Sequence, residues 1–147
     1  MFCSSLNESD ETIPNTNICP ICMGHPGTLP VINRAAFEHV IRVGLALSGE
    51  ITSFTQFERK NYFYPDLPKG YQISQYAFPL VRNGALEFSN ANGEPKRIRI
   101  QRVHLEEDTG RSIHDPVSKT TLLDFNRAGI PLMELVTEPD LRDAADA

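Results

Sequence analysis

Apolar residues first recur at helical spacing between Phe37 and Leu47, three or four positions apart. That spacing places them on one face of a helix. Asn33 stands just before this run, and an asparagine side chain there accepts hydrogen bonds from the free amides of a first helical turn. We therefore predict a helix that begins after Asn33 and ends at Gly49 in a left-handed cap.

Beyond this helix the pattern changes to short runs that predict β-strands. Asn83-Gly84 separates two of them and is the strongest hairpin-turn signal, and a second turn is predicted at Asn92-Gly93. Strands are predicted over residues 51–57, 71–76, 80–82, 85–88, 96–106, 122–125 and 132–137, and a loop over 59–70. The pattern fits the α+β class, with a mixed or antiparallel sheet and few helices.

The strand predicted over 96–106 alternates irregularly. Ile98 and Ile100 share one parity and Val103 and Leu105 the other. A β-bulge at Gln101-Arg102 would bring all four apolar residues to one face. The opposite face would then carry the polar residues Arg97, Arg99, His104 and Glu106.

The end of that strand concentrates charge in the run from His104 through Glu106 and Glu107 to Asp108. Adjacent carboxylates repel one another unless a cation or solvent separates them. Carboxylate oxygens with one imidazole nitrogen suit Mg²⁺. The alternative is a strand that runs out into a solvated acidic turn, and from these residues alone both interpretations stay open.

Three cysteines form a second candidate site. Cys19 and Cys22 have the spacing of a zinc knuckle, and Cys3 offers a third thiolate. A structural zinc ion needs four ligands, and His25, a carboxylate or water would supply the fourth. The alternative is three unliganded thiols.

The segment from residue 60 to 75 mixes aromatic, basic and amide side chains. Such a density of hydrogen-bonding groups suits a phosphate, a nucleotide or RNA bases, and the alternative is an ordinary surface loop. No glycine-rich phosphate loop of the Walker or Rossmann type is present in the sequence. The candidate residues of this segment are Lys60, Tyr62, Tyr64, Lys69, Gln72 and Ser74.

Composition narrows the class of protein. The chain has 147 residues with a net charge of −5, so no global basic field attracts nucleic acid. No apolar run approaches the roughly 18 residues of a membrane span, and the N-terminus lacks the pattern of a secretory signal. We expect no membrane partner and a cytoplasmic location, or an organellar matrix in a eukaryote.

Several runs together resemble the B subunit of the aminoacyl-tRNA amidotransferase that makes Gln-tRNA(Gln) and Asn-tRNA(Asn). The longest matching run covers residues 59–76, and it is highly specific. The other matching runs are 14–22, 29–31, 102–108, 124–132 and 134–140. The resemblance covers nearly the whole chain.

The resemblance implies a cradle domain similar to glutamine synthetase. Family members use ATP and Mg²⁺ to phosphorylate the side-chain carboxylate of glutamate or aspartate mischarged on tRNA. Ammonia that an amidase subunit releases from glutamine displaces the phosphate, and a third, small subunit joins the pair. The implied activity is that of a carbon–nitrogen ligase with glutamine as amide donor; the alternative is a non-catalytic fragment or a zinc-knuckle interaction module.

The resemblance also implies roles for individual residues. The family's Mg²⁺ ligands fall on His104, Glu106 and Glu107, with Glu107 first and Glu134 as a further acidic candidate. Lys60 and Lys69 would contact phosphate or line the ammonia path with Glu107. Nucleotide contacts are assigned to Tyr62, Tyr64, Gln72, Ser74 and Arg127, with an ion pair to Asp124 as the alternative for Arg127.

Two departures from the family pattern shape the expectation for this chain. Family members begin with a strand bearing a Glu and a His that contribute to the metal site, and this chain starts after it. Zinc-bearing members carry a second cysteine where this chain has Ser5. We expect a partial catalytic domain over 1–147, with a degenerate zinc knuckle within 3–25 and without the C-terminal helical and tRNA-binding tail domains. We expect this domain to be inactive alone.

Overall fold

The computed structural model describes residues 1–8, 10–28 and 31–144. Within this part the chain forms two compact units, and each is described by itself. The first unit contains Met1–Ala36, Glu58–Ser74 and Glu106–Leu132. The second contains Phe37–Phe57, Gln75–Leu105 and Met133–Ala147. Positions 29 and 30 of the matching run 29–31 lie outside the described residues.

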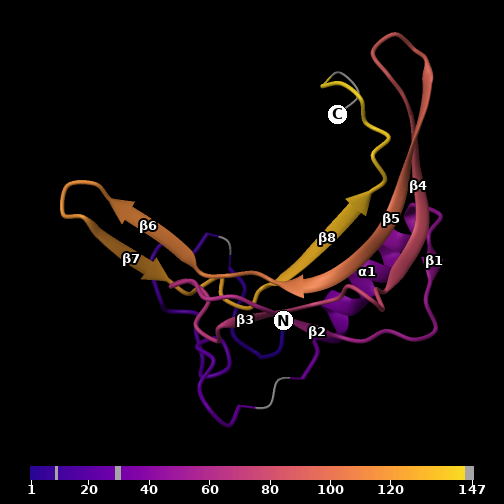
Figure 1. Cartoon of the computed structure of the whole chain (residues 1–147). Helices are drawn as coiled ribbons and strands as arrows, with labels where there is room; N and C mark the ends of the chain where they lie inside the picture. Colours follow the sequence, from indigo (N-terminus) through magenta and orange to yellow (C-terminus); the bar gives the residue numbers. More distant parts are fainter. Residues whose placement is uncertain (9, 29–30, 145–147) are drawn as a thin grey trace. The chain divides into compact units, whose positions relative to one another are not determined.

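The second unit contains most of a four-stranded sheet (Figure 1). Its strand order is β1-β4-β5-β8, and β4 pairs antiparallel with both β1 and β5. The strands are β1 (Glu50–Ile51), β4 (Val81–Ser89), β5 (Pro95–Glu107) and β8 (Pro131–Thr137). The α+β class with antiparallel strands, predicted from the sequence, is confirmed in the described residues.

Helix α1 (Arg34–Ala46) begins where the sequence predicts. The Asn33 side-chain oxygen accepts hydrogen bonds from the backbone N–H groups of Ala35 at 2.9 Å and Ala36 at 3.3 Å, as an N-cap does. In the described part of the chain, no helix combines the length and the apolar character needed to cross a membrane.

The end of α1 packs on β4 at Val81, which is fully buried. A Cβ on Gly44 would lie 2.5 Å from a Val81 methyl carbon, and one on Gly49 would lie equally close. The residue with left-handed backbone is Ser48, with φ of 53°, so the cap predicted at Gly49 is wrong. Gly49 is required instead by close packing against β4.

The core of the second unit lies between this helix and the sheet. Burial of each large aliphatic side chain stabilises the unit by roughly 1.5–3 kcal/mol relative to exposure. The most deeply buried members are Val40, Leu80, Val81, Val103 and Leu105.

The hairpin predicted at Asn83-Gly84 is wrong, because both residues lie inside β4. Asn83 takes a positive φ of 58° within the strand. A Cβ on Gly84 would lie 3.0 Å from the carbonyl oxygen of Leu47, so this glycine permits a close approach of two backbones. The turn that joins β4 to β5 is the second predicted one, at Asn92-Gly93, where Gly93 N–H donates to Asn90.

The bulge predicted at Gln101-Arg102 is also wrong. Strand β4 pairs Arg82 with Arg102 and Gly84 with Ile100, so one residue lies between these pairs on each strand and none is inserted. The apolar pattern changes parity for another reason. Every residue of β5 from Val103 to its end is buried, so both faces of the strand are covered there.

The first unit contains two short antiparallel pairs. Strand β2 (Glu58–Asn61) pairs with β3 (Tyr71–Ser74), and β6 (Arg111–Asp115) pairs with β7 (Thr120–Asp124). Neither β2 nor β6 was predicted. Their largely exposed and polar sequences lack the apolar alternation that marks a half-buried strand.

Candidate active site and cysteine cluster

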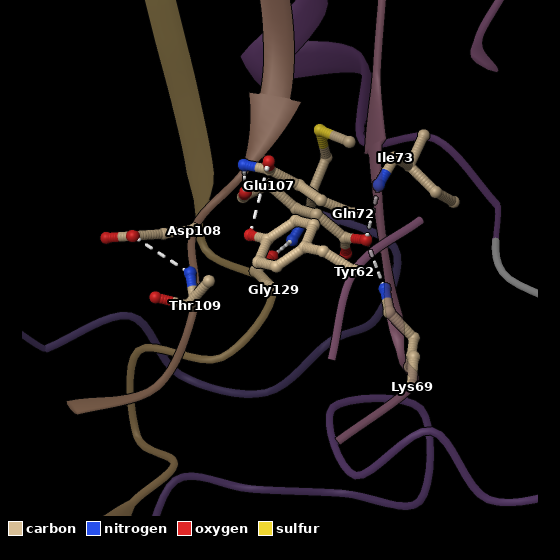
Figure 2. A network of polar contacts seen from close by, with 9 residues as sticks. Tyr62, Lys69, Gln72, Ile73, Glu107, Asp108, Thr109 and Gly129 are labelled. Atoms are coloured by element: carbon tan, nitrogen blue, oxygen red, sulfur yellow. Dashed lines mark hydrogen bonds and ion pairs between the residues drawn. The ribbon is translucent and has the colours of Figure 1, made fainter. Parts of the chain in front are cut away.

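The end of β5 places the Glu107 carboxylate in the interior of the first unit, where 2% of the residue is exposed. Its Oε1 forms an ion pair with the Lys69 ammonium and accepts a hydrogen bond from the Ile73 N–H at 3.0 Å. The Gln72 side-chain amide donates to the Glu107 carbonyl at 2.6 Å. Figure 2 shows these contacts around Glu107. One buried carboxylate is therefore held by a cation and by a backbone donor.

The partners of Glu107 come from the turn that leads into β3. Gly70 has a φ of +74° and donates its N–H to the Leu67 carbonyl at 3.1 Å, which closes a tight turn after Lys69. Leu67 is 4% exposed and anchors this turn in the unit. The turn thus directs Lys69 and the first residues of β3 toward the same carboxylate.

Glu106 is held separately from Glu107. Side chains alternate along a strand, so neighbouring Glu106 and Glu107 project from opposite faces of β5. The Ser74 hydroxyl donates to Glu106 Oε2 at 2.8 Å, and Glu106 is buried. Gln72 and Ser74, predicted as nucleotide contacts, therefore hold Glu107 and Glu106 in this structure.

Tyr62 lies close to this acidic group. Its hydroxyl faces the Gln72 side-chain oxygen at 3.5 Å. Burial raises the pKa of the Tyr62 phenol, and the surrounding negative charges, of which Asp66 and Glu106 are the strongest, raise it further. The phenol therefore stays protonated at neutral pH and is available as a donor.

Lys60 and Tyr64 lie on the surface. Lys60 is exposed on β2, and its ammonium lies 5.8 Å from the centre of the Tyr62 ring. Tyr64 is 66% exposed and packs edge-on against Tyr62. Of the two lysines that the sequence singled out, Lys69 is the one that contacts a candidate catalytic carboxylate.

The second unit contains the other two predicted Mg²⁺ ligands. His104 Nε2 lies 3.9 Å from Glu134 Oε2. His104 is buried, whereas the Glu134 side chain is 43% exposed. This pair offers one nitrogen and one oxygen ligand.

Arg127 pairs with the Asp108 carboxylate, so the alternative pairing with Asp124 is wrong. Asp124 instead accepts a hydrogen bond from the Asn126 N–H at 3.0 Å. The exposed Arg127–Asp108 pair contributes less than about 1 kcal/mol to stability. The cavity lined by these residues measures about 450 Å³, and Arg111 lines it too.

The structure brings the three cysteines together in the first unit. The Cys22 sulfur lies 3.5 Å from those of Cys3 and Cys19, and 3.6 Å from the Ser5 hydroxyl. One ligand atom from each cysteine falls within 4.8 Å of the others, the arrangement that a metal ion requires. His25 is exposed, whereas the Ser5 hydroxyl contacts Cys22 of the cluster.

A tight turn presents two of these thiols. Backbone hydrogen bonds from Met23 to Cys19 and from Gly24 to Ile21 close the turn. Burial alone would raise the pKa of Cys19, but hydrogen bonds from Ser5 and Cys22 outweigh it and lower the pKa to about 7. Burial raises the pKa of Cys22 to about 11. Cys19 therefore ionises before Cys22.

The fold and the site define an α+β domain with a buried glutamate–lysine centre next to a cysteine cluster. The family model described as "GatB/GatE catalytic domain" matches residues 1–147, the whole chain. The chain therefore belongs to the GatB/GatE catalytic-domain family, which confirms the resemblance found in the sequence.

Curated relatives agree with this assignment. The chain is 56% identical over 134 residues to the B subunit of the aspartyl/glutamyl-tRNA(Asn/Gln) amidotransferase of Thermodesulfovibrio yellowstonii, covering 91% of this chain and 28% of the relative. It is 53% identical over 150 residues to the protein of the same name in Methanosarcina barkeri, covering 100% and 30%. For Thermomicrobium roseum the identity is 54% over 149 residues, covering 100% and 31%. The chain thus spans less than a third of the length of these three relatives.

Proposed function

We propose that this chain forms part of the catalytic domain of an aminoacyl-tRNA amidotransferase. In the proposed reaction, ATP phosphorylates the side-chain carboxylate of glutamate or aspartate mischarged on tRNA, and ammonia derived from glutamine displaces the phosphate. The name of the relatives, which are B subunits of an aspartyl/glutamyl-tRNA(Asn/Gln) amidotransferase, supports this proposal. The observation that carries it is the pair of buried carboxylates, Glu106 and Glu107, with the Lys69 ammonium on Glu107.

The chemistry requires activation, because a carboxylate anion is a poor acyl donor. Transfer of a phosphoryl group concentrates negative charge, which Mg²⁺ neutralises when bound. Glu107 offers hard carboxylate oxygens to this ion, and we assign it as the first ligand. Glu106, which projects from the opposite face of β5, is a further acidic candidate. His104 and Glu134 are the other candidate ligands, and His104 Nε2 lies 3.9 Å from Glu134 Oε2 within the second unit.

Lys69 orients Glu107 for this role. The ammonium of Lys69 and the N–H of Ile73 both bind Oε1, which fixes the plane of the carboxylate. Oε2 lies 3.5 Å from the position of a Cβ on Gly129, an ordinary van der Waals contact distance. We further propose that Lys69 and Glu107 line the path of ammonia, which can accept a hydrogen bond from one and donate to the other.

For ATP we assign Arg127 to the phosphates. Its cavity of about 450 Å³ is in the range of small-molecule sites, roughly 300–1,000 Å³. Tyr62, Tyr64 and Lys60 remain candidate contacts for the nucleotide. Gln72 and Ser74 act as positioning residues for the two glutamates.

The proposal includes partners. The amidase subunit supplies ammonia from glutamine, a third, small subunit joins the pair, and mischarged tRNA is the substrate. The word "subunit" in the relatives' name supports an assembly of several different chains. We place this protein-biosynthesis activity in the cytoplasm, or in an organellar matrix in a eukaryote.

We also propose that Cys3, Cys19 and Cys22 hold Zn²⁺, with Ser5 or water on the fourth side. The convergence of the three sulfurs supports this assignment. The same cluster favours a second candidate function, a non-catalytic zinc-knuckle module that binds RNA or a partner protein.

Reconstitution distinguishes the two functions. The protein is assembled with its amidase and small partner subunits and supplied with mischarged tRNA, glutamine and ATP, and both amide formation and ATP hydrolysis are measured with and without Mg²⁺. The catalytic proposal expects Mg²⁺-dependent turnover that Glu107→Ala abolishes and that Glu87→Ala, at an exposed glutamate of β4, leaves unchanged. Tight tRNA binding without ATP turnover would contradict it and favour the module.

A further inference from the structure

The turn that carries the cysteines also touches the lysine of the active site. Gly24, two residues after Cys22, has a φ of +65°. A Cβ built on Gly24 would lie 2.3 Å from Cγ, 3.0 Å from Cα and 3.2 Å from Cβ of Lys69. The backbone of this turn therefore lies directly against the stem of Lys69, in space that no side chain can share.

This contact matters because a lysine stem is flexible. Four rotatable bonds allow an ammonium many positions, and holding it in one costs up to about 2 kcal/mol of rotamer entropy. The Lys69 side chain is nevertheless only 13% exposed, and its ammonium sits on Glu107. Gly24 bounds the stem on one side, and the ammonium lies 5.3 Å from the centre of the Tyr71 ring.

The same turn approaches Glu107 through a very small cavity. Cys3 and Cys22 line it together with Lys69 and Glu107, and its volume is about 10 Å³, at the lower limit for one water molecule. The cysteine cluster and the ion pair are therefore packed nearly in contact. Because there is little free space between them, a displacement of the turn would also displace Lys69.

We propose that Gly24 is a positioning residue for the active site: it holds the stem of Lys69 so that the ammonium stays on Glu107. The consequence for activity rests on the proposed function, whereas the placement of Lys69 does not. The cysteine cluster then serves the reaction indirectly, by fixing the turn that carries Gly24.

The test compares two glycines of neighbouring turns in the assembled amidotransferase. Gly24→Ala introduces the clash with Lys69. Gly27→Ala is the matched control, because Gly27 also has a positive φ, +86°, but no atom lies within 4 Å of its Cβ position. Both variants carry the backbone cost of a positive φ, and only the first moves the lysine.

The first readout is independent of activity. Acetylation of lysines by a small reagent is followed by mass spectrometry, with the exposed Lys60 as internal reference. We expect Lys69 to be protected in the parent protein and in Gly27→Ala, and to be labelled several-fold faster in Gly24→Ala. Equal labelling of Lys69 in the two glycine variants would overturn the proposal.

The second readout is a double-mutant cycle on amide formation. We expect Gly24→Ala to lower kcat by about 100-fold, the scale of a 1 Å misplacement, and to have no further effect once Lys69→Ala has removed the stem. If the kcat losses of the two single variants multiply in the double variant, the positioning role is overturned. If Lys69→Ala leaves amide formation unchanged while the labelling result holds, the proposed function fails and the placement stands.

Folding of the variant provides a further test. If Gly24→Ala does not assemble, adding Lys69→Ala together with Glu107→Gln should recover assembly, because the first change removes the Cγ that lies 2.3 Å from the new Cβ and the second removes the buried charge that Lys69 compensates. Failure to recover would overturn the proposal, since the clash would then lie elsewhere.

Discussion

Lys69 and Glu107 form an ion pair whose side chains are only 13% and 2% exposed. The pair joins the turn before β3 to the last residue of β5 (Figure 2). Taking two charges out of water costs several kcal/mol per ion, so each charge depends on its partner for compensation. The same two residues therefore govern both the stability of the first unit and its proposed chemistry.

Breaking this pair should destabilise the protein strongly. Lys69→Met keeps the length of the stem but leaves the Glu107 charge buried, and we expect a loss of about 3–5 kcal/mol in urea denaturation. Adding Glu107→Gln should recover part of the loss, because it removes the uncompensated charge. Lys60→Met, at an exposed position of β2, is the control and should stay within about 0.5 kcal/mol. Similar losses for both lysines would contradict the geometry.

Zinc affinity should depend on Ser5. Ser5→Cys places a thiol on the fourth side of the cluster, where the hydroxyl lies 3.6 Å from Cys22. Because a fourth thiolate closes the tetrahedral site, we expect at least about tenfold tighter zinc binding in competition with a chromophoric chelator. Ser4→Cys adds a thiol at the exposed neighbouring position and should leave the affinity unchanged. Equal gains from the two variants would argue against the assigned geometry.

Alkylation of the metal-free protein should favour Cys19 over Cys22. Its pKa is lowered to about 7, so its rate with iodoacetamide should rise as pH passes through 7, while Cys22, with a pKa of about 11, stays protected. The lowered pKa of Cys19 stabilises the folded protein fully above the ordinary thiol pKa near 9, and this contribution is lost as pH falls through 7. The raised pKa of Cys22 has the opposite effect: its contribution is present below pH 9 and is lost as pH rises through 11. Mass spectrometry of the modified peptides identifies the thiol, and earlier modification of Cys22 would refute this ordering.

ATP affinity should depend on Arg127 with little effect on stability. The Arg127 side chain is 63% exposed, so Arg127→Gln should change the free energy of unfolding by less than about 1 kcal/mol. If its guanidinium binds a phosphate of ATP, KM for ATP rises by tenfold or more, a loss typical of a charged hydrogen bond. Arg111→Gln, in the same cavity, controls for the loss of one positive charge, because four carboxylates also line that cavity, those of Glu8, Glu11, Asp108 and Asp124. Equal effects of the two substitutions would assign the change to the lost charge and not to a specific contact of Arg127.

Predictions from local sequence were confirmed where a residue forms hydrogen bonds with backbone groups close to it in the chain. Asn33 caps α1 because its side chain reaches amides two and three residues away. The Asn92-Gly93 turn likewise depends on a local bond and a positive φ at Gly93. The spacing of Cys19 and Cys22 also identified two thiols that the structure brings together.

Predictions from local sequence were wrong where packing against a distant segment determines the backbone conformation. Asn83-Gly84 has the chemistry of a turn, yet it lies inside β4 because Gly84 accommodates the backbone of Leu47. The change of parity in β5 was explained by a bulge, whereas the strand keeps its register and is covered on both faces near its end. The residues of these two strands do not by themselves show which other segments will pack against them.

Some features of the candidate site were likewise predictable from the sequence, and others were not. Sequence by itself determined the family, the α+β class and the acidic end of β5, and it predicted Glu107 and Lys69 as candidate site residues. Only the tertiary structure decided that Lys69 rather than Lys60 meets Glu107, that Arg127 pairs with Asp108, and that Gly24 lies against the Lys69 stem. The physical reason is that burial of a charge and close approach of two backbones are properties of segments far apart in the chain, which only folding brings together.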